Sequence, residues 1–86
     1  MKIFFHKNFE KQYKKLKAKE RKRTRESLVL FLKDPFHPLL NNHPLSGRYT
    51  DYRSVNITGD LRVVYKRVSE TECVFVAIDT HSNLYS

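Results

Sequence analysis

The spacing between apolar positions predicts helical structure in the first third of the chain. Residues 8–17, NFEKQYKKLK, carry apolar side chains at i, i+4 and i+7: Phe9, Tyr13 and Leu16. This spacing places them on one face of a helix, and Asn8 is its expected N-cap. The preceding residues 1–5, MKIFF, form a short apolar run that predicts a first strand.

A second helix is predicted from about Glu20 to Lys33. Its apolar end, residues 28–32, is expected to dock into the core. The helix should end at Asp34-Pro35, because proline disfavours helical geometry in the residue before it. The segment that follows, FHPLLNNHPLSG, contains two prolines and a glycine and is predicted to be a loop.

The rest of the chain changes to the alternation that is typical of strands. Residues 48–57 and 61–68 alternate between apolar and polar positions, and residues 73–78 are nearly all apolar. The connections between these segments are short, which favours antiparallel neighbours. The order β-α-α-β-β-β therefore predicts one α+β domain over residues 1–86, with a mostly antiparallel, twisted sheet and both helices packed on one face.

The period of two along a strand also sorts the arginines between faces. Arg62 points away from the face that carries Leu61, whereas Arg53 shares its face with Val55 and Ile57. The two arginines lie on adjacent strands, so the register decides whether they meet. We expect the helices to cover the more apolar face and the other face to form a basic surface, on which arginine can hold phosphate through two hydrogen bonds.

The net charge of +8 is concentrated in one segment. Ten Lys or Arg residues and two Glu residues lie between Lys7 and Arg25, and this segment accounts for the whole net charge. Such a face is typical of proteins that bind nucleic acid, an anionic membrane or an acidic partner, whereas a merely solubilising helix surface normally mixes charges of both signs. The residues expected to bind RNA are Lys11, Lys14, Lys15, Lys19, Lys22 and Arg23, together with Arg53 on the sheet.

Polar residues of the second half form a set that can transfer protons and bind phosphate without a metal. The set consists of His43, Arg53, Asp60, Arg62, His81 and Tyr85. Each member also has an ordinary structural explanation. Asp60 follows Gly59 in a predicted turn, where Asp is common, and His81 follows the last strand.

Other kinds of site are not indicated. The sequence has no metal-ligand spacing and no glycine-rich phosphate loop, so we expect no metal and no small-molecule cofactor. Its one cysteine, Cys73, rules out an internal disulfide and fits a cytoplasmic location. No run approaches the roughly 20 apolar residues of a membrane span, so we expect no membrane partner.

Three motifs stand in the second half of the chain: HPLSG at 43–47, YRSVNITGDLRVVYK at 52–66 and THSNLY at 80–85. Their order and spacing resemble those of the RelE/ParE superfamily of bacterial type II toxin–antitoxin toxins, most closely its YafQ-like branch. The first strand and the basic helices also resemble the opening of that family. The resemblance covers nearly the whole chain and implies a RelE-like fold.

The resemblance implies a ribosome-dependent mRNA endonuclease that a cognate acidic antitoxin holds inactive. In such toxins the 2′-hydroxyl of the message attacks the adjacent phosphodiester without a metal and leaves a cyclic phosphate and a free 5′-hydroxyl. By position, His43, Asp60 and His81 match YafQ-type catalytic residues. Tyr85 matches the aromatic residue near the C-terminus, and Arg62 lies where RelE-type toxins place a phosphate-binding arginine. The implied partners are the antitoxin, the ribosome, and mRNA and rRNA.

The chain departs from the YafQ-like pattern at three positions. Asn56 stands where the branch has a second strand histidine, Ala77 where it has an arginine, and Leu61 where it has a tryptophan. Two alternatives therefore stay open: a ParE-like toxin that inhibits gyrase, and a non-catalytic module that binds rRNA. His81 and Tyr85 argue against the ParE-like alternative, because that branch generally lacks this pair.

Overall fold

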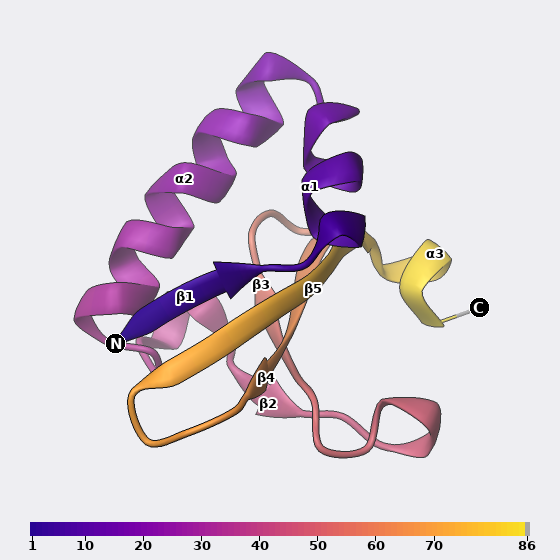
Figure 1. Ribbon diagram of the computed structural model, residues 1–86. Helices are drawn as coiled ribbons and strands as arrows, with labels where there is room; N and C mark the ends of the chain where they lie inside the picture. The colour runs from indigo at the N-terminus through magenta and orange to yellow at the C-terminus, as the bar shows by residue number, and fades with distance from the viewer. Residues whose placement is uncertain (86) are drawn as a thin grey trace.

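The computed structural model describes residues 1–85 and consists of a helical hairpin, a twisted sheet and a short C-terminal helix (Figure 1). The sheet has five strands in the order β1-β5-β4-β3-β2. Their bounds are β1 Lys2–Phe5, β2 His43–Pro44, β3 Arg53–Asn56, β4 Leu61–Arg67 and β5 Glu72–Thr80. The helices are α1 Lys7–Lys14, α2 Ala18–Lys33 and α3 His81–Tyr85, with 3-10 turns at Pro38–Leu40 and Gly47–Tyr49.

The predicted α+β architecture is confirmed, with an antiparallel sheet except at one edge. Strand β1 runs parallel to β5, and the other neighbouring strands are antiparallel. Parallel neighbours require a long crossover. Here the connection from β1 to β5 contains α1, α2 and the strands β2, β3 and β4. The last strand thus comes to lie beside the first one.

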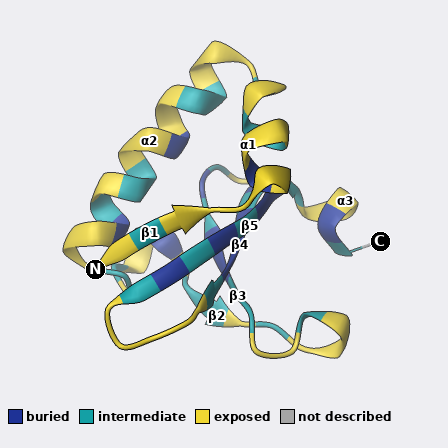
Figure 2. Cartoon of the chain, viewed as in Figure 1, coloured by how far each residue is buried: buried dark blue, intermediate teal, exposed yellow. Residues whose placement is uncertain are grey.

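The main core lies between the sheet and the helices α1 and α2. Phe31 of α2 is 1% exposed, and its ring lies 5.1 Å from that of Tyr65 and 5.3 Å from that of Phe75. Both pairs have the edge-to-face geometry that aromatic rings favour. Phe9 anchors α1 to the same core. The turn that joins the helices extends beyond the sheet and is largely exposed (Figure 2).

A second, smaller cluster covers the opposite face of the sheet. Val64 and Ala77 lie at its centre, and Leu84 of α3 packs on them at 4% exposure. Tyr49 and Tyr85 border this cluster. The face away from α1 and α2 is therefore partly apolar rather than purely basic, and α3 is the element that covers it.

Several details differ from the sequence-based predictions. The segment predicted to be a loop contains the short strand β2, so the sheet has five strands rather than four. The strand predicted at 48–57 begins only at Arg53, because Gly47 and Asp51 have positive φ angles of 66° and 77°, which extended backbone does not allow. The N-cap of α1 is His6, whose Nδ1 accepts a hydrogen bond from the Asn8 amide at 3.0 Å. The Asn8 side chain instead donates to the Val76 carbonyl at 3.0 Å and ties α1 to β5. Helix α3 was not predicted.

Candidate functional site

The strand register gathers polar side chains on the sheet face that α3 covers. Residues directly opposite each other on antiparallel strands point to the same face. Asn56 of β3 lies opposite Arg62 of β4, and Arg62 lies opposite Asp79 of β5. Two residues away on β3, Ser54 lies opposite His43 of β2. Of the predicted site residues, His43 and Arg62 therefore share this face.

The turn between β3 and β4 lies against the start of α3. The His81 amide donates to the Asp60 carbonyl at 2.9 Å, so these two predicted site residues are neighbours in space. Both side chains are exposed. Within α3, His81 and Tyr85 are one helical turn apart, and their ring centroids are separated by 4.8 Å. The Asp60 backbone and the rings of His81 and Tyr85 thus lie at one corner of the sheet.

Arg62 stabilises the turn that carries Asp60. Its guanidinium donates to the carbonyls of Thr58 at 2.8 Å and Gly59 at 2.9 Å. The side chain is half-buried. This arrangement fixes a positive charge at the turn that contains Asp60. It also means that Arg62 has a structural role in the turn.

His43 has one ring nitrogen engaged by the backbone. Its Nδ1 lies 2.8 Å from the carbonyl oxygen of Asn41. Because a carbonyl can only accept a hydrogen bond, Nδ1 carries the proton. In the neutral ring Nε2 is then the basic nitrogen, which is the state required of a general base.

Arg53 lies on the other face of the sheet. It pairs with Tyr65 of the main core, and its Nε donates to the Asn42 Oδ1 at 2.7 Å. The guanidinium also lies 5.2 Å from the ring centroid of Phe36. The register thus separates Arg53 from Arg62 and assigns Arg53 a packing role on the helix face.

Three buried polar atoms near the site have no hydrogen-bond partner among the described residues. They are the Ser54 Oγ, the Asn56 Oδ1 and the Tyr85 hydroxyl. Ser54 and Asn56 lie on the same face as His43 and Arg62. Leaving such an atom unpaired costs about 1–3 kcal/mol, so each of them calls for a physical explanation such as a catalytic role or local strain.

The sequence reasoning missed Asp79, which joins three elements beside the site. Its Oδ1 accepts a hydrogen bond from the Asn83 side chain of α3 at 3.1 Å, and its Oδ2 lies 3.5 Å from the Gln12 amide of α1. Gln12 also accepts from the Ile78 amide at 2.9 Å. In the sequence, Asp79 can be recognised as a polar residue at the end of an otherwise apolar strand. Residues 1–85 contain no cluster of metal-ligating side chains.

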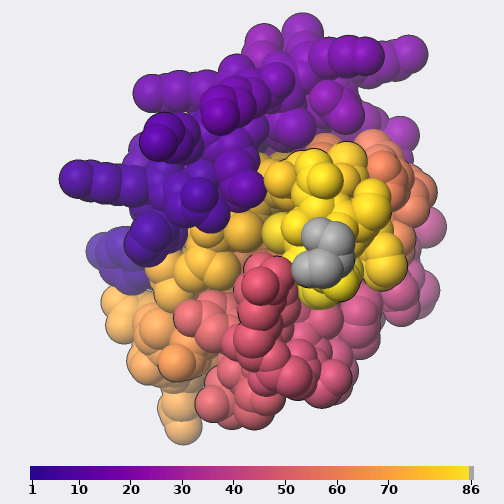
Figure 3. All heavy atoms as spheres, turned by 90° about the vertical axis from the view of Figure 1, so that its right-hand side faces the viewer, coloured from indigo at the N-terminus to yellow at the C-terminus, as the bar shows by residue number. Residues whose placement is uncertain are grey.

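The predicted basic residues form an exposed surface on the helical hairpin. Those of α1 border a shallow hollow of about 720 Å³, lined by Lys7, Asn8, Glu10, Lys11, Lys14 and Lys15. Lys19, Lys22 and Arg23 of α2 are exposed as well. Figure 3 shows α3 between these helices and the segment near residue 50, so the basic surface adjoins the site.

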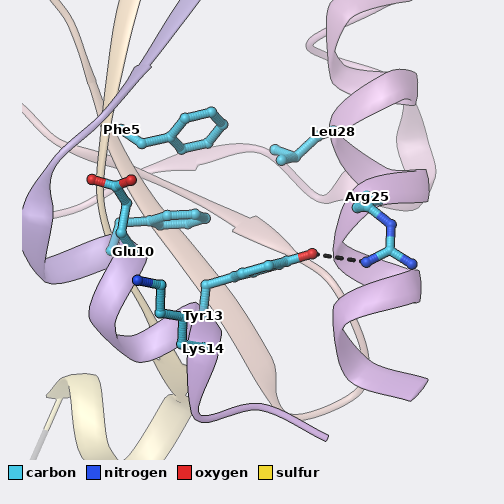
Figure 4. Close-up of a pocket in the computed structure, with 7 residues that line it drawn as sticks. Phe5, Glu10, Tyr13, Lys14, Arg25 and Leu28 are labelled. Atoms are coloured by element: carbon cyan, nitrogen blue, oxygen red, sulfur yellow. Dashed lines mark hydrogen bonds between the residues drawn. The ribbon is translucent and has the colours of Figure 1, made fainter. Parts of the chain in front are cut away.

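An apolar groove separates α1 from α2 (Figure 4). It has a volume of about 370 Å³, and its floor consists of Phe5, Phe9, Tyr13 and Leu28. Arg25 donates to the Tyr13 hydroxyl at 2.9 Å across the groove, and Lys14 and Glu10 lie at its rim. Within residues 1–85, no helix is long and apolar enough to cross a bilayer.

Known structures share this fold over nearly their whole length. YafQ from E. coli strain BL21(DE3) superposes with a TM-score of 0.80 at 21% identity, covering 98% of this chain and 97% of that chain. A YoeB/ParE toxin from Agrobacterium tumefaciens gives 0.77 at 22% identity, with 94% and 99% covered. The E. coli DinJ-YafQ toxin-antitoxin complex gives 0.72 at 23% identity, with 98% and 96% covered. No curated protein sequence matches the chain significantly.

These likenesses show that the chain has the fold of the YafQ and YoeB/ParE toxins. The sequence profile described as "Bacterial toxin of type II toxin-antitoxin system, YafQ" matches residues 1–86. The chain therefore belongs to the YafQ family of type II toxins.

Proposed function

We propose that the protein is a ribosome-dependent endoribonuclease that cleaves mRNA and thereby inhibits translation. The observation that carries this proposal is the backbone contact between the Asp60 turn and α3. The turn is stabilised by the Arg62 guanidinium, and α3 carries His81 and Tyr85, whose rings are in contact. The side chains of Asp60 and His81 are exposed, that of Arg62 is half-buried, and the Tyr85 hydroxyl is buried. Because ribosomes are its target, we place the protein in the cytoplasm.

The proposed reaction is an in-line attack of the 2′-hydroxyl on the adjacent phosphorus. A new P–O bond forms, the bond to the 5′-oxygen breaks, and a 2′,3′-cyclic phosphate and a free 5′-hydroxyl result. One group must take the proton of the 2′-hydroxyl, and another must protonate the leaving 5′-oxygen. We assign the main proton transfer to His81, assisted by Asp60, and the opposite end of the reaction to His43.

Arg62 and Tyr85 complete the proposed site. An arginine remains charged at neutral pH and can stabilise the extra negative charge that develops on the phosphate in the transition state. Arg62 is held at the correct corner by its bonds to the turn, with other N–H groups left to meet phosphate. Tyr85 lies against His81 and offers a ring on which a base can stack.

Single-turnover cleavage of message on programmed ribosomes, read by primer extension, tests the assignment. His81→Ala should lose roughly 10²- to 10⁴-fold in rate, because it removes a general acid or base, while ribosome binding is kept. Ser82→Ala is the matched control, since Ser82 is the exposed neighbour of His81 on α3. Wild-type-like cleavage by His81→Ala would show that another group or the ribosome supplies the proton transfer.

The basic hairpin is the proposed contact with ribosomal RNA. Exposed lysines on α1 and α2 can neutralise phosphates without reading sequence. Their charge also favours an acidic antitoxin segment that folds on binding. The groove between α1 and α2 offers that segment an apolar floor and the cationic side chains of Lys14 and Arg25 at its sides. The DinJ-YafQ toxin-antitoxin complex of E. coli supports an antitoxin as the partner.

A non-catalytic rRNA-binding module is the second candidate. Arg62 already donates to backbone carbonyls, and Asn56 and Ala77 replace polar residues of the YafQ-like pattern. A module of this kind would bind ribosomes with the affinity set by the basic hairpin and leave the message intact. A DNA-supercoiling assay would reveal the ParE-like activity, which the likeness to the YoeB/ParE toxin keeps open.

A further inference from the structure

The segment between β2 and β3 contacts the C-terminal end of α3, although the two are far apart in sequence. Arg48 Nη2 donates to the Leu84 carbonyl at 3.3 Å. The ring of Tyr49 meets that of Tyr85 edge-to-face, with 5.9 Å between centroids and an interplanar angle of 85°. The Arg48 guanidinium lies 5.2 Å from the centroid of the Tyr49 ring. Two adjacent residues thus make separate contacts with one helix.

The loop that presents these residues has its own internal hydrogen bonds. Gly47 adopts a φ of 66°, and its carbonyl accepts from the amide of Thr50 at 3.2 Å and from its hydroxyl at 2.7 Å. The Tyr52 amide donates to the Tyr49 carbonyl at 2.9 Å, and the Tyr52 carbonyl accepts from the Leu45 amide at 2.9 Å. The loop is therefore closed upon itself before it touches α3.

Helix α3 needs such support because it is only five residues long. An isolated helix of this length is not stable in water, and its last carbonyls have no partner within the helix. Leu84 anchors its buried side, and the contacts from Asp79 and Asp60 hold its first residues. At the other end, Arg48 supplies a donor to a terminal carbonyl and Tyr49 supplies a packing surface.

We propose that Arg48 and Tyr49 are positioning residues for the reaction, which is an inference that rests on the proposed nuclease function. They hold α3 in the orientation that presents His81 and Tyr85 to the scissile phosphate, and they act through α3 rather than on the substrate. Displacement of a reacting group by about 1 Å can cost roughly 100-fold in rate. A helix that is anchored at only one end can undergo such a displacement.

The test combines cleavage with a measurement of order in α3. Arg48→Met and Tyr49→Ala should each lower the single-turnover rate at saturating ribosome by roughly 10- to 100-fold. Tyr49→Phe should restore the rate to within about twofold, because it keeps the edge-to-face ring pair. Arg67→Met is the matched control: it removes the same charge, but Arg67 binds the carbonyls of Ser69 and Glu70 at the far end of β4.

Backbone ¹⁵N relaxation of the free protein supplies the second readout. Arg48→Met and Tyr49→Ala should lower the heteronuclear NOE of residues 82–85, while Arg67→Met and Tyr49→Phe leave it unchanged. A loss of cleavage without a loss of order in α3 would overturn the proposal, because Arg48 would then act on RNA directly. Unchanged order and unchanged cleavage would overturn it as well. If the wild-type protein does not cleave message, the proposed function fails, and the relaxation data alone decide whether the loop holds α3.

Discussion

Asn42 links the chain just before β2 to the main core, and its removal should cost more stability than any single exposed contact. Its Oδ1 accepts from the Arg53 Nε at 2.7 Å. Its Nδ2 donates to the Tyr65 hydroxyl at 2.7 Å and to the Pro35 carbonyl at 2.9 Å. One amide therefore joins β3, β4 and the loop after α2, immediately before His43 of the candidate site.

The expected loss follows from these contacts. Asn42→Ala removes one hydrogen bond to a charged group, worth about 1.5–3 kcal/mol, and two neutral ones, worth about 0.5–1.5 kcal/mol each. Solvent reaches part of Arg53, so we take the lower end of these ranges and expect a loss of about 2.5 kcal/mol. A chain of 86 residues has a total stability of roughly 4–13 kcal/mol, so this is a large fraction of it.

Urea denaturation followed by circular dichroism measures the change. The slope of the unfolding free energy against urea should stay constant, because the surface exposed on unfolding hardly changes. Asn83→Ala is the matched control, since the exposed Asn83 side chain makes one bond to Asp79. Although the acceptor is a carboxylate, the bond is exposed and water can replace it, so the loss should be less than about 1 kcal/mol.

A second variant separates the hydrogen bonds of Asn42 from its packing. Tyr65→Phe removes the hydroxyl and should cost about 1 kcal/mol. In the double variant with Asn42→Ala, the Tyr65→Phe cost should almost vanish, because the bond between them is already gone. Equal losses for Asn42→Ala and Asn83→Ala, or full additivity with Tyr65→Phe, would refute this account of the network.

Three further predictions concern the basic surface, the groove and the buried thiol. Replacing Lys11 and Lys14 of α1 and its C-cap Lys15 with glutamine should weaken ribosome binding and lower the slope of log K against log salt by roughly 2 to 3. An unchanged salt titration would contradict this. Leu28→Glu in the groove floor should weaken binding of the acidic antitoxin at least about tenfold by titration calorimetry, whereas Val29→Glu, which adds the same charge outside the groove, should have a smaller effect. Burial raises the pKa of the Cys73 thiol, so the folded protein keeps a proton that the unfolded chain loses above about pH 8.5. The contribution of Cys73 to stability is therefore complete below that pH and is lost as the pH rises. Urea titrations at pH 7 and pH 9.5 should show a smaller loss of unfolding free energy between the two pH values for Cys73→Ala than for the wild-type protein.

The helices were predictable because their apolar residues follow one period over several turns. Phe9 and Tyr13 of α1 reach the core as the spacing predicts, and α2 ends before Pro35. The segment at 48–57 was predicted as one strand because its residues alternate. That pattern does not reveal a positive φ at Asp51, where the hydrogen bond from the Tyr52 amide to the Tyr49 carbonyl closes a turn within the loop.

The motifs located one corner of the site but not the contacts within it. Asp60, Arg62 and His81 come together because the β3–β4 turn and the end of β5 lie at the same edge of the sheet, which short antiparallel connections already implied. Helix α3 has five residues and shows no detectable period. Its supporting residue Arg48 acts at a distance of 36 residues along the chain, and no local pattern can predict that contact.

The alternation of side chains along β3 decides on which face of the sheet Arg53 lies. Arg53 shares its strand face with Val55 and Ile57, and those two residues belong to the core beneath the helices. The apolar partners therefore decide the face, and the arginine must follow them because side chains alternate. Its charge is tolerated there because Asn42 accepts from the guanidinium and the ring of Phe36 covers it at the open end of the core. Of the arginines Arg53 and Arg62, only Arg62 lies on the sheet face of His43 and α3. The proposed phosphate binding on the sheet therefore depends on Arg62, and the basic hairpin must supply the remaining positive charge.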